Sequence, residues 1–148
     1  MSQSLTPYLT VSNAAAAVDF YKNALGAEEL RRHAAPDGTN RLMHVHLRLH
    51  GSDLMLADDF PEHMGSSRTP EKFGGSPVTL HLHLEKDVDQ IWANAMAAGA
   101  KATMPLADQF WGDRYGQFTD PFGHSWSVGQ TIKTVTEEEL VEGAQAAF

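Results

Sequence analysis

The chain contains no cysteine among its 148 residues. Disulfides, thiolate nucleophiles and cysteine-ligated zinc are therefore excluded. Basic residues are also scarce, with 11 Lys and Arg against 19 Asp and Glu, for a formal net charge of −8. Because nucleic acids and anionic membrane surfaces are bound through clusters of positive charge, we expect neither as a partner.

Long apolar runs are missing too. No stretch approaches the roughly 20 apolar residues that span a bilayer, and the N-terminal residues lack the pattern of a secretory signal. We therefore expect a cytoplasmic protein. Phosphate-binding loops, His-Glu-x-x-His elements and nucleophile motifs are likewise absent from the sequence, which leaves covalent hydrolysis and nucleotide chemistry without support. The length and 42% apolar content suit one domain, residues 1–148, with a single core.

The residues that are present show an internal repeat. Two segments, 14–25 and 88–99, carry the apolar spacing of an amphipathic helix, and each ends at a Gly-Ala pair. The two pairs lie 73 residues apart, about half the chain. Alternating or β-rich segments flank both helices in the same order: 8–11, 28–32, 41–49 and 53–57 in the first half, and 78–84, 101–104, 115–119 and 124–128 in the second.

Each half of the sequence therefore has the predicted element order βαβββ, and the predicted fold class is α+β. We expect two βαβββ modules whose mixed, largely antiparallel sheets form a cup with flanking helices. Pro- and Gly-rich linkers, one between the modules and one at residues 105–114, are candidate rims of a site. The predicted boundaries are a first module at about 5–60, a linker at 61–77, a second module at about 78–130 and a helical tail at 131–148 that begins with a Thr136–Glu139 capping box.

Four of the eight histidines form two His-x-His pairs, His44 with His46 and His81 with His83. Strand alternation puts both members of a pair on one face of a strand. Imidazole is a common metal ligand and acid–base group near neutral pH, so these faces are candidate sites. The alternative is that they are ordinary polar residues on a solvated face. In the first of these strands we expect Met43, Val45, Leu47 and Leu49 to pack under a helix, opposite His44, His46, Arg48 and His50.

Two further features are candidates. Asp58 ends a predicted strand, where it could supply a carboxylate ligand or base, or serve only the turn that follows. Trp111, Arg114 and Tyr115 lie in or beside a linker, a composition that suits a planar or anionic small ligand. The alternative is that Trp111 fills a gap between helix and sheet while Arg114 pairs with Asp113.

Several motifs carry a resemblance to a known family. They are Phe-Tyr-Lys-Asn-Ala-Leu-Gly-Ala at 20–27, Phe-Trp-Gly-Asp-Arg-Tyr-Gly at 110–116 and Asp-Pro-Phe-Gly-His at 120–124. With the repeated βαβββ pattern, the chain resembles the vicinal oxygen chelate superfamily, the fold of glyoxalases, bleomycin-resistance proteins and extradiol dioxygenases. Within it, the sequence is similar to the PhnB-like branch. The resemblance implies a homodimer and a small-molecule ligand.

Members of that superfamily either bind a divalent metal that polarises substrate oxygens or bind a drug without metal. Carried over by position, the resemblance places a metal ligand at Asp58 and one near His81. The eighth-strand position, usually Glu, falls on Ser127, and the first-strand position falls near Thr6 or Tyr8, so two of four positions depart from the pattern. A metal-ligand set of His44, Asp58 and His81 would require the strands to converge. The resemblance does not imply this set.

Three functions are compatible with these residues. One is a lyase, isomerase or dioxygenase that uses His44, His81 and Asp58 as acid–base groups or as ligands of one Zn, Ni, Mn or Fe ion. Another is a metal-free protein that binds and sequesters a drug, antibiotic or similar small molecule. The third is a dimeric scaffold without ligand. The predicted substrate contacts are His46, His83, Trp111, Arg114 and Tyr115.

Overall fold

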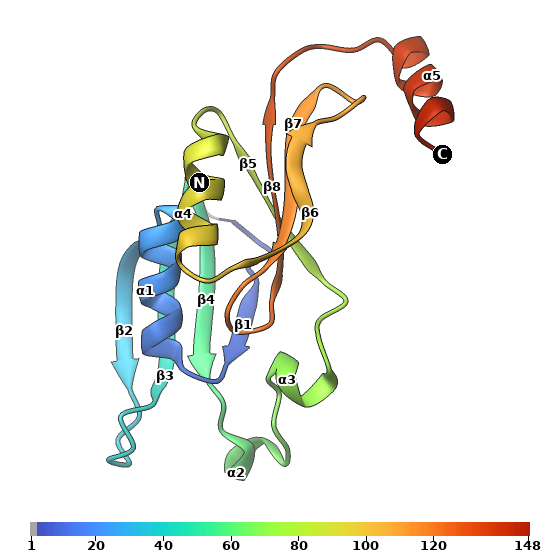
Figure 1. Ribbon diagram of the computed structural model, residues 1–148. Helices are drawn as coiled ribbons and strands as arrows, with labels where there is room; N and C mark the ends of the chain where they lie inside the picture. The colour runs from blue at the N-terminus through green and yellow to red at the C-terminus, as the bar shows by residue number, and fades with distance from the viewer. Residues whose placement is uncertain (1–2) are drawn as a thin grey trace.

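A computed structural model describes residues 3–148 and confirms the α+β fold of two βαβββ modules (Figure 1). Two one-turn helices lie in the linker between the modules, and one helix follows the second module. The first module consists of β1 (Tyr8–Val11), α1 (Ala14–Leu25), β2 (Glu28–Ala34), β3 (Leu42–Leu49) and β4 (Ser52–Asp58). The linker helices are α2 (Pro61–Met64) and α3 (Pro70–Phe73). The second module consists of β5 (Thr79–Leu84), α4 (Val88–Ala97), β6 (Lys101–Asp108), β7 (Asp113–Thr119) and β8 (Ser125–Thr131), and α5 (Glu137–Ala147) follows it.

Each module forms one four-stranded mixed sheet. The strand orders are β1-β4-β3-β2 and β5-β8-β7-β6, so the two sheets have the same topology. In each, the first strand of the module pairs in parallel with the last, and the remaining pairs are antiparallel. The internal repeat inferred from the sequence is therefore a repeat of structure.

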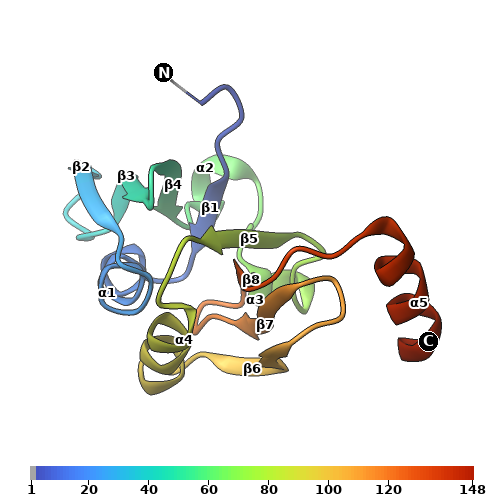
Figure 2. The same ribbon diagram turned by 90° about the horizontal axis from the view of Figure 1, so that it is seen from above.

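The core lies on the helix-covered faces of the two sheets. Helices α1 and α4 lie side by side, each against its own sheet (Figures 1 and 2). Helix α1 begins at Asn13, whose side chain accepts the N–H of Ala16, and ends at Gly26 in the left-handed conformation that glycine adopts readily. The buried apolar residues of both modules form one continuous cluster. The face of each sheet that points away from α1 and α4 is the open face.

The Asp-Pro-Phe-Gly-His motif joins the modules through a buried carboxylate. Tyr21 of α1 donates its hydroxyl to Oδ2 of Asp120 at 2.6 Å, and Trp126 donates its indole N–H to the same oxygen at 2.9 Å. The other oxygen accepts the backbone N–H groups of Phe122 and His124. Because all four of these donors bond to the one buried carboxylate of Asp120, this motif is structural and fixes α1 against the second sheet.

Three predictions about local structure are corrected. Leu42 is buried and Met43 is 50% exposed, the reverse of the predicted alternation, because the pairing of β2 with β3 shifts register at this end of the strand. His50 leaves the strand face: it lies in a turn with a φ of 48°, and its Nε2 contacts the carbonyl oxygen of Leu25 at 2.9 Å. Strand β6 continues through Pro105 instead of ending before it, since β6 is an edge strand whose register shifts there.

The tail helix α5 begins with the predicted capping box between Thr136 and Glu139. It projects beyond the β6–β7 turn (Figure 1) and has no buried residue. It approaches Phe110 closely at Gly143, where an added Cβ would lie 2.8 Å from the Phe110 side chain. No helix in residues 3–148 has the length and apolar character needed to cross a membrane.

Candidate functional site

The open face of the first sheet carries a cavity with a volume of about 770 Å³. Its floor consists of strand residues that point away from α1, including Tyr8 and Met43. Its walls come from the β2–β3 loop on one side and from α2 and the segment after it on the other. The lining residues are Tyr8, Thr10, Ala35, Pro36, Asp37, Met43, Ala57, Asp58, Asp59, Phe60, His63, Met64 and Arg68.

Much of this lining is apolar or aromatic. Tyr8, Met43 and Met64 are each about half exposed, at 53%, 50% and 49%. Methionine adapts its shape to irregular partners, and an aromatic ring offers a large flat contact surface. The cavity therefore has the character of a small-molecule site, an apolar concavity with few polar groups.

Asp58 lies at the base of the cavity with both carboxylate oxygens engaged. Oδ1 accepts the N–H of Ala14 at 2.8 Å, and Oδ2 accepts the N–H of Leu42 at 2.6 Å. The residue is only 8% exposed. Asp58 thus supplies an acceptor to the first N–H of α1 and to the start of β3, a position where the helix dipole also favours a negative charge.

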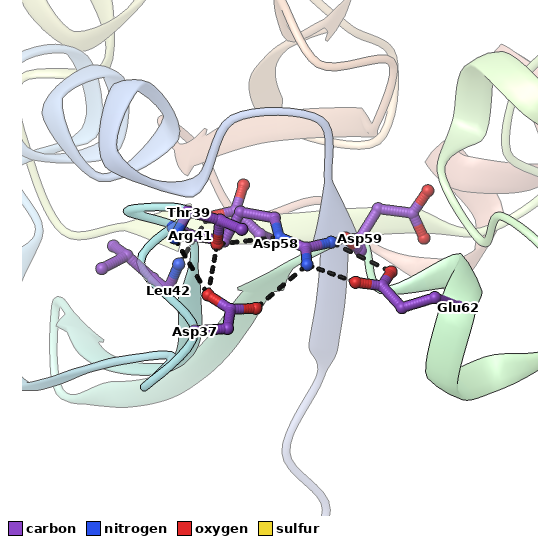
Figure 3. A network of polar contacts seen from close by, with 7 residues as sticks. All are labelled: Asp37, Thr39, Arg41, Leu42, Asp58, Asp59 and Glu62. Atoms are coloured by element: carbon purple, nitrogen blue, oxygen red, sulfur yellow. Dashed lines mark hydrogen bonds and ion pairs between the residues drawn. The ribbon is translucent and has the colours of Figure 1, made fainter.

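Arg41 joins the two walls of the cavity (Figure 3). It donates to Asp37 in the β2–β3 loop, to the carbonyl oxygen of Asp59 and to both carboxylate oxygens of Glu62 on α2. Its guanidinium also lies 4.2 Å from the centre of the Phe60 ring. Hydrogen bonding from Arg41 lowers the pKa of Glu62 to about 2, so this ion pair is present across the physiological pH range. Arg41 thereby fixes the distance between the walls.

Tyr8 and His44 form a hydrogen-bonded pair beside the cavity. The Tyr8 hydroxyl lies 2.8 Å from Nδ1 of His44, whose ring stacks on His33 with 6.3 Å between centres. Burial, followed by the neighbouring His33 and His46, lowers the pKa of His44, and burial raises the pKa of Tyr8. Both shifts favour the neutral forms of the two groups, and the tautomer of His44 determines which of them donates.

The predicted contact His46 lies on the same face of β3 but does not join this pair. Its Nε2 is 3.5 Å from Oδ2 of Asp53 and has no hydrogen-bond partner among residues 3–148.

On the second sheet, His81 and His83 lie side by side on the open face of β5. Nε2 of His81 is 3.2 Å from Nδ1 of His83, and Tyr115 stacks on His81 with 5.8 Å between ring centres. The outer nitrogens contact hydroxyls of β8: His81 Nδ1 lies 2.8 Å from Ser127 Oγ, and His83 Nε2 lies 2.9 Å from Thr131 Oγ1. Burial, followed by His83, lowers the pKa of His81.

The three predicted contacts around the β6–β7 turn do not lie together: Trp111 packs against Tyr115, whereas Arg114 points toward α4. Trp111 packs edge-on against Tyr115, with 5.3 Å between ring centres, and donates its N–H to Asp113. Arg114 instead bonds Asp89 at the start of α4 at 2.8 Å and Asp108 at 2.9 Å. It therefore lies toward the helix side with its charge already paired, and its predicted alternative partner, Asp113, is bonded to Trp111.

The structure does not bring His44, Asp58 and His81 together. Within residues 3–148 no group of three or more His, Asp or Glu side chains is arranged to hold a metal ion. His44 contacts Tyr8 and His81 contacts Ser127, on separate sheets, while the oxygens of Asp58 accept backbone N–H groups. A metal ligand needs a free lone pair aimed at the ion. The predicted set of three therefore does not fit a metal.

Several cavity residues escaped the sequence analysis. Met43, Phe60 and Met64 line the cavity, and none of them stands in a metal-ligand or catalytic motif. One wall lies in the linker between the modules, which its Pro- and Gly-rich composition had predicted to be the rim of a site.

Comparison with known proteins places this geometry in a family. Residues 4–128 match the model of the Glyoxalase/Bleomycin resistance protein/Dioxygenase superfamily. The chain belongs to this superfamily. An uncharacterised protein of Mycobacterium bovis, Mb0911c, is 48% identical over 138 residues, which cover 93% of this chain and 89% of that protein.

Two solved structures share the fold. The PhnB protein of Bacillus cereus has a TM-score of 0.67 at 20% identity, covering 86% of this chain and 99% of that one. The fosfomycin resistance protein FosX of Listeria monocytogenes, solved with Mn(II) and sulfate, has a TM-score of 0.62 at 15% identity, covering 95% and 98%. The match of residues 4–128 to the family model confirms the predicted superfamily. The two structures, at low identity, show that the fold is shared, and a PhnB protein is among these structural neighbours.

Proposed function

We propose that this superfamily member binds an aromatic small molecule without metal, in the cavity on the open face of the first sheet. The observation that supports this most directly is the composition of the cavity, which combines exposed Tyr8, Met43 and Met64 with a volume suited to a drug-sized ligand. The walls are held by Arg41 before any ligand arrives, which reduces the entropy lost on binding.

The charges of the cavity favour a cationic ligand. Three aspartates line it, Asp37, Asp58 and Asp59, against one arginine, Arg68. Arg41, beside the cavity, pairs with both Asp37 and Glu62, so the carboxylates remain in excess. The whole chain carries a net charge of −8, which raises the local concentration of cations. An aromatic cation would therefore contact the apolar and aromatic side chains of the cavity and be attracted by its carboxylates.

A metal-dependent lyase, isomerase or dioxygenase built on His44, Asp58 and His81 has less support. Asp58 is buried and both of its oxygens accept backbone N–H groups. No group of three or more His, Asp or Glu side chains within residues 3–148 is arranged to hold a metal ion, so Asp58 does not belong to such a ligand set.

We also propose that the chain forms a homodimer that covers the open sheet faces. The half-exposed Tyr8, Met43 and Met64 form an apolar surface that a second copy could close. Sedimentation velocity at micromolar concentration should then show a dimer, and a monomer at all concentrations would contradict this part of the proposal.

Thermal denaturation in EDTA tests the binding proposal. The compounds are aromatic amines, neutral aromatics and aromatic carboxylates of matched size. At a free concentration of 100 times Kd, a ligand should stabilise the protein by about 2.7 kcal/mol. Amines should stabilise most and carboxylates least.

A pair of Ala→Phe variants locates the site. Ala57 lines the cavity, so Ala57→Phe should fill it and abolish the stabilisation. Ala102 is exposed on the other sheet, so Ala102→Phe should bind as the wild type does. No stabilisation by any compound, or equal stabilisation of both variants, would contradict the proposal.

A further inference from the structure

The aspartates that line the first-sheet cavity are already hydrogen-bonded within the protein. Both oxygens of Asp58 accept backbone N–H groups. The two oxygens of Asp59 accept a backbone N–H and a hydroxyl of the segment after α2. Those of Asp37 accept donors of its own loop and of Arg41. Every carboxylate oxygen of the three lining aspartates therefore already has a donor from the protein.

These engaged carboxylates act on a cationic ligand mainly through their electric field. A primary ammonium carries three N–H donors, each of which needs an acceptor once the group leaves water. A quaternary ammonium has the same charge but no N–H donor. The cavity therefore attracts both kinds of cation, while its lack of free carboxylate oxygens is a disadvantage to the primary ammonium alone.

Tyr8 and Phe60 both place an aromatic ring in the cavity lining, but only one of them already carries a cation. The guanidinium of Arg41 lies 4.2 Å from the centre of the Phe60 ring. Among residues 3–148 no cation–π contact involves Tyr8, which is 53% exposed. The Tyr8 ring is thus open to a cation brought by the ligand.

The Tyr8 ring is held in place by histidines of two other strands. Strand β4 lies between β1 and β3, and the Tyr8 hydroxyl reaches across it to Nδ1 of His44, at 2.8 Å. His44 in turn stacks on His33 of β2. Because the hydroxyl is anchored before a ligand arrives, the ring loses little rotamer entropy on binding. His44 is therefore a positioning residue for Tyr8.

We propose that the ligand of the first-sheet cavity is an aromatic quaternary ammonium compound whose cationic group lies on the Tyr8 ring. This inference rests on the proposed function and names the ligand class of that site. Met43 and Met64, each about half exposed, pack against the alkyl groups on the charged nitrogen. Tyr8 is then the residue that determines the preference for a cation over a neutral compound.

Isothermal titration with a matched series of compounds tests the ligand class. The series keeps one aromatic group and ends in a primary ammonium, a trimethylammonium or an uncharged tert-butyl group. The trimethylammonium compound should bind at least as tightly as the primary ammonium and roughly tenfold more tightly than the tert-butyl compound. Tighter binding of the primary ammonium would overturn the proposal, because it would show that a carboxylate accepts the N–H donors directly.

Variants of the ring and of its anchor test the roles of Tyr8 and His44. Tyr8→Leu should lower the affinity for the trimethylammonium compound by roughly tenfold and that for the tert-butyl compound much less. Tyr8→Phe keeps a ring and should retain most of the preference. His44→Ala should reduce the preference, and His44→Gln, whose amide can bond to the hydroxyl, should restore it. Phe73→Leu is the matched control, because Phe73 is 69% exposed and lies outside the cavity lining.

The ratio of the two affinities, trimethylammonium to tert-butyl, separates specificity from stability, because a general loss of folding lowers both. Cooperative urea unfolding of each variant checks that it folds. A ratio in Tyr8→Leu equal to that of the wild type would contradict this inference while leaving the proposed function in place. No binding of any compound in the series would contradict the proposed function itself, and this inference with it.

Discussion

Replacement of Asp58 by alanine distinguishes between two roles for this residue, a structural carboxylate and a metal ligand. The side chain is 8% exposed, and its two oxygens accept the N–H groups of Ala14 and Leu42 at 2.8 and 2.6 Å. Alanine would leave both donors without an acceptor. At about 1–3 kcal/mol for each unpaired buried donor, we expect Asp58→Ala to lower the free energy of unfolding by about 2–6 kcal/mol.

Urea denaturation followed by circular dichroism measures this loss directly, from the midpoint and the slope of the transition. For a chain of this size, 1 kcal/mol corresponds to roughly 2–4 °C in Tm, so the melting temperature should fall by at least about 4 °C. Asp58→Asn should lie between the two proteins, because its amide oxygen can accept one N–H while its NH₂ group faces the other.

The control for this experiment is Asp19→Ala. Asp19 is exposed on α1 and makes no hydrogen bond or ion pair with residues 3–148 apart from those of the helix backbone, so its loss should change stability by less than about 0.5 kcal/mol. The reasoning is refuted if Asp58→Ala is as stable as Asp19→Ala. It is refuted most clearly if that stable variant has also lost a metal that the wild type binds.

Two further predictions concern a buried hydroxyl and a titrating histidine. Tyr21→Phe removes a buried donor to Asp120 and should lower the free energy of unfolding, measured by urea denaturation, by about 1–3 kcal/mol. Because both residues share this interaction, Tyr21→Phe should cost less in a protein that already carries Asp120→Ala. Full additivity of the two losses would contradict the shared interaction. Burial lowers the pKa of His44, so its NMR titration midpoint should lie below 6.5. The contribution of His44 to stability should then be fully present above pH 6.5 and decline as pH falls through the lowered pKa; a midpoint above 6.5 would contradict this.

The fold could be predicted from the sequence because its signals are local and repeated. Helix spacing over 14–25, the Gly-Ala pair that follows and the alternation in 78–84 recur at a fixed offset, and each of these features determines one element. The errors lie where tertiary pairing overrides local pattern: the register shift that exposes Met43, and the edge strand that continues through Pro105.

The candidate site could be predicted only in part, because alternation gives the face of a residue but not the partner of its side chain. His81 and His83 were correctly placed on one face of a strand, yet their orientation depends on hydroxyls more than 40 residues away. Asp58 was placed correctly at a strand end, and only the fold shows that α1 and β3 both use its oxygens.

The cavity was missed for a related reason. It forms where β1, β3, β4, the β2–β3 loop and α2 meet, and none of these segments alone has the composition of a binding site. Its two walls are joined by Arg41, whose partners lie 4, 18 and 21 residues away in the chain.

The central claim is that the first-sheet cavity binds an aromatic ligand without metal. Isothermal titration with the amine that stabilises the protein most, performed in EDTA and again with added Zn²⁺, tests it most directly. We predict one ligand per chain, the same affinity in both buffers, and no binding to Ala57→Phe. Binding that occurs only with Zn²⁺, or that persists in Ala57→Phe, would contradict the account.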